Sequence, residues 1–254
     1  MLPGSDLFFD DSLTLLERWY CRIFGVPIIG LRIRLRRIQK LLPEHATTIL
    51  DAGCGRGVIS RYLARRYPEA QIEAIDENET IQAINHNIAL KYQLQNCHFK
   101  TLSLENFDEH SHYDLIISVD NLEHIKDDVA ILAKLYNALR SGGVLIVHVP
   151  HYYRRWPLFK LTVNFDVPGH VRPGYHLAEL TERVRKVGFD IQQLGFSYGF
   201  LENLINNISY RITDAEEKNK YLYALLFPFL NVIAWTGKWS HPEMGAGVWL
   251  IAKK

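Results

Sequence analysis

A glycine-rich segment at residues 49–57 has the residue spacing that most clearly indicates chemistry. It reads ILDAGCGRG, so an apolar run leads through one acidic residue into three glycines at alternating positions. Glycines let a backbone turn tightly and approach a ligand closely, and a helix starting there offers free N–H groups and a positive dipole end. This pattern is typical of a nucleotide-type site at the carboxyl end of the first strand of an α/β sheet.

A second acidic position points to a ligand that carries a ribose. Asp76 ends the next apolar run, about 20 residues after the glycines. A carboxylate there can accept both ribose hydroxyls, and hydrogen bonds to an ionised carboxylate are strong. The dinucleotide fingerprint G-x-G-x-x-G/A does not fit, because its third small position would fall on Val58.

A parallel sheet has to bring these positions together. Between about residues 45 and 195, short β-rich apolar runs alternate with helical patterns, which predicts βαβ units. The expected strands are residues 48–50, 71–75, 97–101, 113–119, 143–149 and 190–195. The expected helices are residues 58–66, 79–92, 127–140 and 176–187, with the sequence SGG at 141–143 as a helix stop.

The order of these motifs resembles the class I S-adenosylmethionine (SAM)-dependent methyltransferases, in particular the small-molecule group with an L-E-H-I type fourth motif. Residues 49–57 are similar to the first motif of that family, and Asp76 is similar to its ribose-binding acid. Residues 113–125 resemble the fourth motif, and the resemblance extends over roughly residues 42–195. It implies SAM as cofactor and a Rossmann-like, seven-stranded, mostly parallel sheet with an antiparallel last strand.

The resemblance also implies a set of cofactor-binding residues. Asp51 would bond backbone N–H groups of the turn and contact the methionine amino group indirectly. The family often has an acidic residue near the adenine, whereas this chain has Leu102 and Ser103 there, which leaves Ser103 as the adenine contact. Asp76 and Asp120 also have purely structural interpretations, as a helix-start residue and as a loop residue, respectively. The candidates are Asp51, Gly53, Cys54, Gly55, Asp76, Glu77, Ser103 and Asp120.

Histidines are the candidates for a general base. The sulfonium of SAM makes its methyl group electrophilic, so the protein has to position and desolvate, and a base matters mainly for a hydroxyl or a ring carbon. His124 and His151 follow the fourth and fifth expected strands and are the two catalytic candidates. We expect no metal, because no acidic ligand spacing accompanies the histidine pairs 148/151 and 170/176.

Two helical segments are appended to this core. Residues 245–252 read as a last strand, and helical patterns at 201–212 and 215–235 fill the long gap before it. We therefore expect one domain with four parts: a helical segment 1–44, a cofactor-binding core 45–196, a helical insertion 197–243 and a final strand 244–254.

The appended segments hold the clues to the acceptor. Residues 31–42 form a basic amphipathic helix, which lies either on an anionic membrane or on the sheet with a solvated basic face. Residues 221–236 are apolar and aromatic, and they fit a lid, a membrane-docking helix, a dimer interface or a core helix. Aromatic residues at 152–159 could line a hydrophobic pocket, where Arg154 and Arg155 could hold an anionic group or be solvated.

Composition narrows the function class. With 254 residues and a formal net charge of +1, no global field draws the chain to nucleic acid. Three scattered cysteines and the lack of a signal-peptide pattern predict a cytoplasmic protein. We expect methyl transfer to oxygen or carbon of a small hydrophobic acceptor: a quinol precursor, a lipid or an aromatic natural product. Peripheral membrane contact and a homodimer stay open. The alternatives are a protein or nucleic-acid methyltransferase and a non-catalytic SAM-binding subunit.

Overall fold

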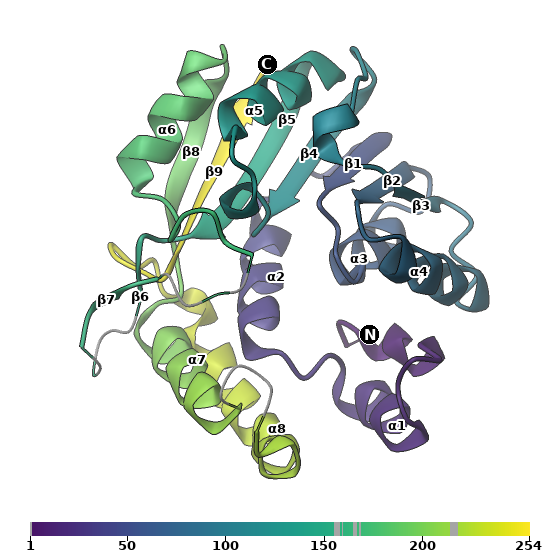
Figure 1. Cartoon of the computed structure of the whole chain (residues 1–254), viewed down its shortest axis with the longest axis vertical. Coiled ribbons are helices and arrows are strands. Elements are labelled where there is room, and N and C mark those ends of the chain that lie inside the picture. The colour runs from purple at the N-terminus through teal and green to yellow at the C-terminus, as the bar shows by residue number, and fades with distance from the viewer. Residues whose placement is uncertain (1, 155–157, 159, 165–166, 168, 214–217) are drawn as a thin grey trace.

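A seven-stranded sheet forms the centre of the computed structural model, which describes every residue except 1, 155–157, 159, 165–166, 168 and 214–217 (Figure 1). The strand order is β3-β2-β1-β4-β5-β9-β8. Strands β1 to β5 are parallel, and β9 pairs antiparallel with both β5 and β8. The strands are β1 (Thr48–Ala52), β2 (Gln71–Asp76), β3 (Cys97–Thr101), β4 (Tyr113–Val119), β5 (Leu139–Pro150), β8 (Asp190–Ser197) and β9 (Gly247–Lys253). The predicted fold class is confirmed.

Helices cover both faces of the sheet, which explains the nearly continuous apolar runs of the central strands. One core packs β-strand residues against α5 (Asp128–Ala138) and α6 (Leu177–Lys186). The opposite core packs them against α3 (Val58–Arg66) and α2 (Ile29–Leu41), while α4 (Glu79–Lys91) lies beside α3 (Figure 1). In β4, Ile116 faces the first core and Ile117 the second, and both are fully buried.

The junction between α5 and β5 differs from the prediction. The helix ends at Ala138, and Leu139 already pairs with Tyr113 on β4. Pairing then slips and resumes with Val144 opposite Leu115, so the intervening residues form a bulge. The glycines predicted as a helix stop lie in this irregularity, where Gly142 has a φ of 77°.

The N-terminal segment is anchored by a buried ion pair. It contains the short 3-10 helix η1 (Ser5–Phe9) and α1 (Leu15–Phe24), which begins with a capping box between Thr14 and Glu17. Asp6 of η1 pairs with Arg61 of α3, and both side chains are fully buried. The segment therefore packs on the helix that follows the glycine-rich turn.

The interpretation of α2 as a helix packed on the sheet is confirmed, but its basic face is largely covered rather than solvated. Leu35 and Ile38 pack on the sheet as expected, but Arg32 and Arg37 are only 5% and 6% exposed. The reason is that α7 (Phe200–Thr213) and α8 (Lys220–Thr236) lie against α2, as Figure 1 shows. The arginines are therefore neither solvated nor available to a membrane.

The insertion folds as a hairpin of α7 and α8. Pro228 inside α8 has no N–H to bond the carbonyl of Ala224, and the hydroxyl of Tyr20 donates to that carbonyl at 2.6 Å instead. No helix among the described residues is both long and apolar enough to cross a membrane. The remaining elements are β6 (Tyr153–Arg154), β7 (Thr162–Val163), η2 (Leu104–Asn106), η3 (Leu122–His124) and η4 (Gly237–Trp239).

Candidate functional site

The glycine-rich turn joins β1 to α3 at the carboxyl edge of the sheet. The backbone N–H groups of Gly53 and Cys54 both donate to the carbonyl of Ile75 at 3.0 Å, which ties the turn to the end of β2. Gly53 has a φ of 79°, and a Cβ there would lie 2.3 Å from the Cγ of Asn121. Both its conformation and its surroundings thus require glycine, and the side chain packed over it comes from the segment after β4.

Asp51 lies beneath the turn and is 2% exposed. Its carboxylate accepts a hydrogen bond at 2.6 Å from the hydroxyl of Ser60, in the first turns of α3, rather than serving the turn amides that the sequence suggested. Burial raises the pKa of Asp51 to about 6, although the Ser60 hydrogen bond opposes this rise. The carboxyl group of Asp51 therefore gains or loses its proton near pH 6.

The surroundings of Cys54 do not favour a role as a nucleophile. Its Sγ lies 3.5 Å from Oε1 of Gln82, and burial followed by the charge of Asp51 raises the pKa of the thiol. A protonated, partly buried thiol is a poor nucleophile. What Cys54 can offer a ligand at this edge is therefore shape rather than charge.

Asp76 ends β2 next to the turn, as the motif spacing predicts. One carboxylate oxygen accepts the N–H of Gly55 at 2.9 Å, and the other accepts the N–H of Asn78 at 3.1 Å. The carboxylate is thus held at the mouth of the turn, and each oxygen retains a second lone pair for a ligand. The neighbouring Glu77 is exposed.

Ser103 lies at the same edge, after β3. The N–H of Leu102 donates to the carbonyl of Asp76 at 3.0 Å, so the loop carrying Ser103 continues beside β2. The hydroxyl of Ser103 accepts the N–H of Glu105 at 3.3 Å and caps η2. The structure therefore brings the turn, Asp76 and Ser103 to one edge.

Asp120 follows β4 in a left-handed conformation with a φ of 49°. One carboxylate oxygen lies 2.8 Å from Nδ1 of His148, and the other lies 2.8 Å from the guanidinium of Arg34. Burial alone would raise the pKa of Asp120, but the positive charge of Arg34 and then the His148 ring outweigh it and hold the pKa below its usual value. The carboxylate is thus ionised and committed to partners on β5 and α2.

The hydrogen-bond network around Asp120 extends along this edge of the sheet to β8. Nε2 of His148 lies 2.7 Å from the hydroxyl of Ser197 at the end of β8. Arg34 also donates to the hydroxyl of Tyr198 at 3.1 Å, and that hydroxyl donates to the carbonyl of Gly30. The sequence did not indicate Arg34 as a site residue, because its partner Asp120 lies 86 residues later in the chain.

The two candidate bases lie in separate histidine pairs. His124 is exposed, its Nδ1 donates to the carbonyl of Gly169 at 3.1 Å, and its ring centre is 4.6 Å from that of His170. His151 is 8% exposed, and its ring contacts His176 and Phe196. Burial, assisted by His176, lowers the pKa of His151, so its imidazole is neutral at pH 7.

Glu123 was also missed, although it stands directly before His124. It is 1% exposed, and burial together with the charge of Asp120 raises its pKa well above the usual value. Of the two arginines proposed for an anionic group, Arg154 lies over the ring of Tyr210 at 5.5 Å. Arg155 lies outside the described residues.

Comparison with known proteins identifies the region that carries these motifs. Residues 49–143 match the model of a family described as a methyltransferase domain. A trans-aconitate 2-methyltransferase of Deinococcus radiodurans is 33% identical over 132 residues, which are 51% of this chain and 49% of that protein. An (S)-coclaurine N-methyltransferase of Thalictrum flavum subsp. glaucum is 26% identical over 151 residues, 59% of this chain and 39% of that one. The matched regions thus span half or less of these relatives.

The fold is shared with solved structures. A SAM-dependent methyltransferase from Mesorhizobium loti superposes with a TM-score of 0.59 at 16% identity, covering 87% of this chain and 98% of that one. At this level of identity the likeness concerns the fold.

Proposed function

We propose that the chain is a class I SAM-dependent methyltransferase and that it transfers the methyl group of SAM to a small, hydrophobic acceptor. The observation that carries the proposal is the meeting of the glycine-rich turn, Asp76 and Ser103 at one edge of the sheet. Among nucleotide-type ligands, this set suits one that carries a ribose and an adenine.

The cofactor-binding residues have distinct parts in this proposal. Asp76 and Glu77 would bind the ribose hydroxyls, and Ser103 would contact the adenine. Gly53 and Gly55 would let the backbone approach the methionine portion, with Asp51 supporting the turn from below. Asp120 would act by holding Arg34 and His148 at the acceptor side, because both of its oxygens already have partners there.

When bound, the cofactor supplies an electrophilic methyl group, so the chain itself has to orient the acceptor and exclude water. His151 has the environment of a proton acceptor, because its buried imidazole is neutral and its Nδ1 has no hydrogen-bond partner among the described residues. His124 is the exposed alternative, because the Nδ1 bond to Gly169 makes Nε2 the accepting nitrogen of its neutral ring.

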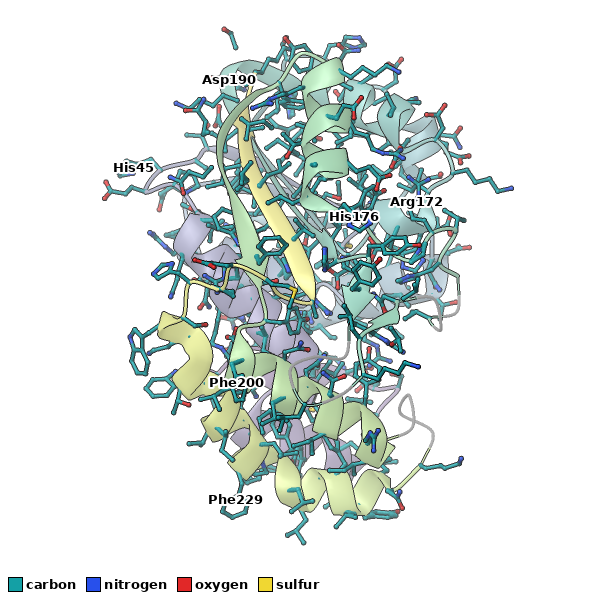
Figure 2. All side chains as sticks on the ribbon, turned by 90° about the vertical axis from the view of Figure 1, so that its left-hand side faces the viewer. His45, Arg172, His176, Asp190, Phe200 and Phe229 are labelled. Carbon is teal, nitrogen blue, oxygen red and sulfur yellow. The ribbon has the colours of Figure 1, made fainter. Side chains whose placement is uncertain are left out.

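Apolar surface on α8 supports a hydrophobic acceptor drawn from a membrane surface. Tyr221, Leu225 and Phe229 recur every four residues and are 83%, 69% and 68% exposed, and Figure 2 shows Phe229 on the outer side of the helix. The opposite face of α8 packs into a core through Tyr223 and Phe227, so a purely buried helix does not account for the pattern. We propose that the protein acts in the cytoplasm and contacts membranes peripherally through this surface.

The membrane part has its own test. Leu225→Glu should reduce sedimentation of the protein with anionic phospholipid vesicles, while Leu90→Glu should not, because Leu90 is equally exposed (64%) but lies on α4. Equal sedimentation of both variants with the wild type would contradict membrane contact. If the wild type is instead a dimer by light scattering and Leu225→Glu is a monomer, the surface is a subunit interface.

Methyl-labelled SAM tests the activity itself. The purified chain is incubated with an extract of its own organism, and the products are partitioned between organic solvent and water. Label in the organic phase supports a hydrophobic acceptor and provides the molecule for mass spectrometry. Label in protein or nucleic acid would keep the activity and overturn the acceptor class. Bound SAM without any transfer would favour a non-catalytic subunit.

A further inference from the structure

Three possible metal ligands gather just after β4. Glu123 and His124 belong to η3, and His170 comes from the chain that crosses over it before α6. One carboxylate oxygen and one nitrogen from each ring lie within 4.8 Å of one another. None of the roles described above for the cofactor-binding residues depends on these three side chains lying together.

Two atoms of this cluster are buried without partners. Oε2 of Glu123 and Nδ1 of His170 have no hydrogen-bond partner among the residues that the structure describes. The Glu123 and His170 side chains are 1% and 5% exposed, and the 3.9 Å between Oε1 of Glu123 and Nε2 of His170 is too long for a good hydrogen bond. An unpaired buried polar group destabilises the folded chain, so two such atoms in one cluster favour a bound ligand between them.

Backbone contacts hold the two segments together around the cluster. The N–H of Val171 donates to the carbonyl of Glu123 at 3.0 Å, and Arg172 donates to the carbonyls of Ile125 and Lys126 at 2.8 Å. Because a carbonyl only accepts, the bond from His124 to Gly169 places a proton on Nδ1, so the lone pair of the neutral ring is on Nε2. Metal-binding histidines are commonly oriented in this way by a carbonyl behind them.

We propose that Glu123, His124 and His170 bind a divalent transition-metal cation. Two imidazoles and one carboxylate suit Zn²⁺, Co²⁺ or Mn²⁺ better than a cation that prefers oxygen ligands alone. Three protein ligands leave coordination positions open, which is typical of catalytic rather than structural sites. Asp120 also acts electrostatically on Glu123, although its ion pair with Arg34 offsets much of its negative charge.

The cation would make a hydroxyl acceptor more acidic, and this part of the inference rests on the proposed function. His124 would then be a metal ligand rather than a general base. The sequence-based expectation of no metal rested on the lack of an acidic ligand near the histidine pairs. It overlooked Glu123, and it paired His170 with His176 instead of His124.

Cobalt binding tests the site without SAM or an acceptor. The full chain, freed of metal with a chelator, is titrated with Co²⁺ and followed by visible absorption and calorimetry. We expect one Co²⁺ per chain, displaced by Zn²⁺ and not by an equal concentration of Mg²⁺. His170→Ala and the near-isosteric Glu123→Gln should each weaken binding roughly tenfold or more.

His176→Ala is the matched control, because His176 forms the other histidine pair, with His151, and lies outside the cluster. This variant should bind Co²⁺ as the wild type does. Added Zn²⁺ should also raise the thermal midpoint of the wild type and of His176→Ala but not of His170→Ala, which separates lost binding from misfolding.

Three results would overturn the proposal: no stoichiometric Co²⁺ binding by the wild type, unchanged affinity in both ligand variants, or loss of binding in His176→Ala alone. Since none of these measurements involves methyl transfer, failure of the metal site and failure of the proposed function are distinguishable.

Discussion

The ribose-binding role proposed for Asp76 gives the sharpest test of the cofactor site. Its two carboxylate oxygens are held by the N–H groups of Gly55 and Asn78 at 2.9 and 3.1 Å, so the carboxylate is already oriented before a ligand arrives. In Asp76→Asn, one oxygen becomes an NH₂ group that cannot accept from its amide partner or from a ribose hydroxyl. Loss of one hydrogen bond to a charged group costs about 1.5–3 kcal/mol, which corresponds to roughly 10- to 150-fold weaker binding.

Calorimetric titration with SAM and with S-adenosylhomocysteine measures this loss. Both ligands share the ribose, so Asp76→Asn should weaken them equally, and Asp76→Ala should weaken them at least as much. Glu79→Gln is the control, because Glu79 is an exposed carboxylate at the start of α4, three residues further on. If the Asp76 variants keep the wild-type fold by circular dichroism and bind both ligands with unchanged affinity, the assignment of Asp76 is wrong.

Three further predictions concern stability measured by chemical denaturation. Burial raises the pKa of Asp51 from 3.8 to about 6, so the contribution of Asp51 to the free energy of unfolding should fall by roughly 3 kcal/mol as the pH rises through this interval. Asp51→Asn should lack that contribution, and parallel pH profiles of the variant and the wild type would contradict the prediction. Arg34→Met should cost about 3 kcal/mol by leaving one carboxylate oxygen of Asp120 without its cation, and the double variant with Asp120→Asn should recover part of the loss; strictly additive costs would contradict coupling. Tyr20→Phe should cost about 1 kcal/mol by leaving the Ala224 carbonyl without its donor, and an unchanged midpoint would mean that water replaces the hydroxyl.

The cofactor edge was predictable because its signals are local. The glycine spacing at residues 53–57 requires a tight turn, and Asp76 follows from the length of one βαβ unit. Parallel strands bring such positions to one edge whatever surrounds them. The apolar stripe of α2 was equally local, since Leu35 and Ile38 share one helical face.

The environment of the arginines on α2 was not predictable in the same way. Five basic residues at positions 32–40 look like a solvated or membrane-facing surface when the helix is considered alone. The burial of Arg32 and Arg37 depends on α7 and α8, which lie more than 150 residues later in the chain. A charge pattern on one helix does not reveal which tertiary partner covers it, and so neither Arg34 nor its partner Asp120 could be paired in advance.

The contrast between residues with a local sequence signal and residues whose surroundings come from distant elements also explains which parts of the site a comparison of sequences can identify. The family model covers residues 49–143, which include the turn, Asp76, Ser103 and Asp120. Arg34, His148 and Ser197 meet around Asp120 but lie outside that region, on α2, β5 and β8. Under the proposed function, the shared region binds the cofactor while the appended helices and late strands shape the acceptor side. Relatives that share the cofactor-binding region can therefore act on different acceptors, and two of the similar proteins are named for trans-aconitate and for coclaurine.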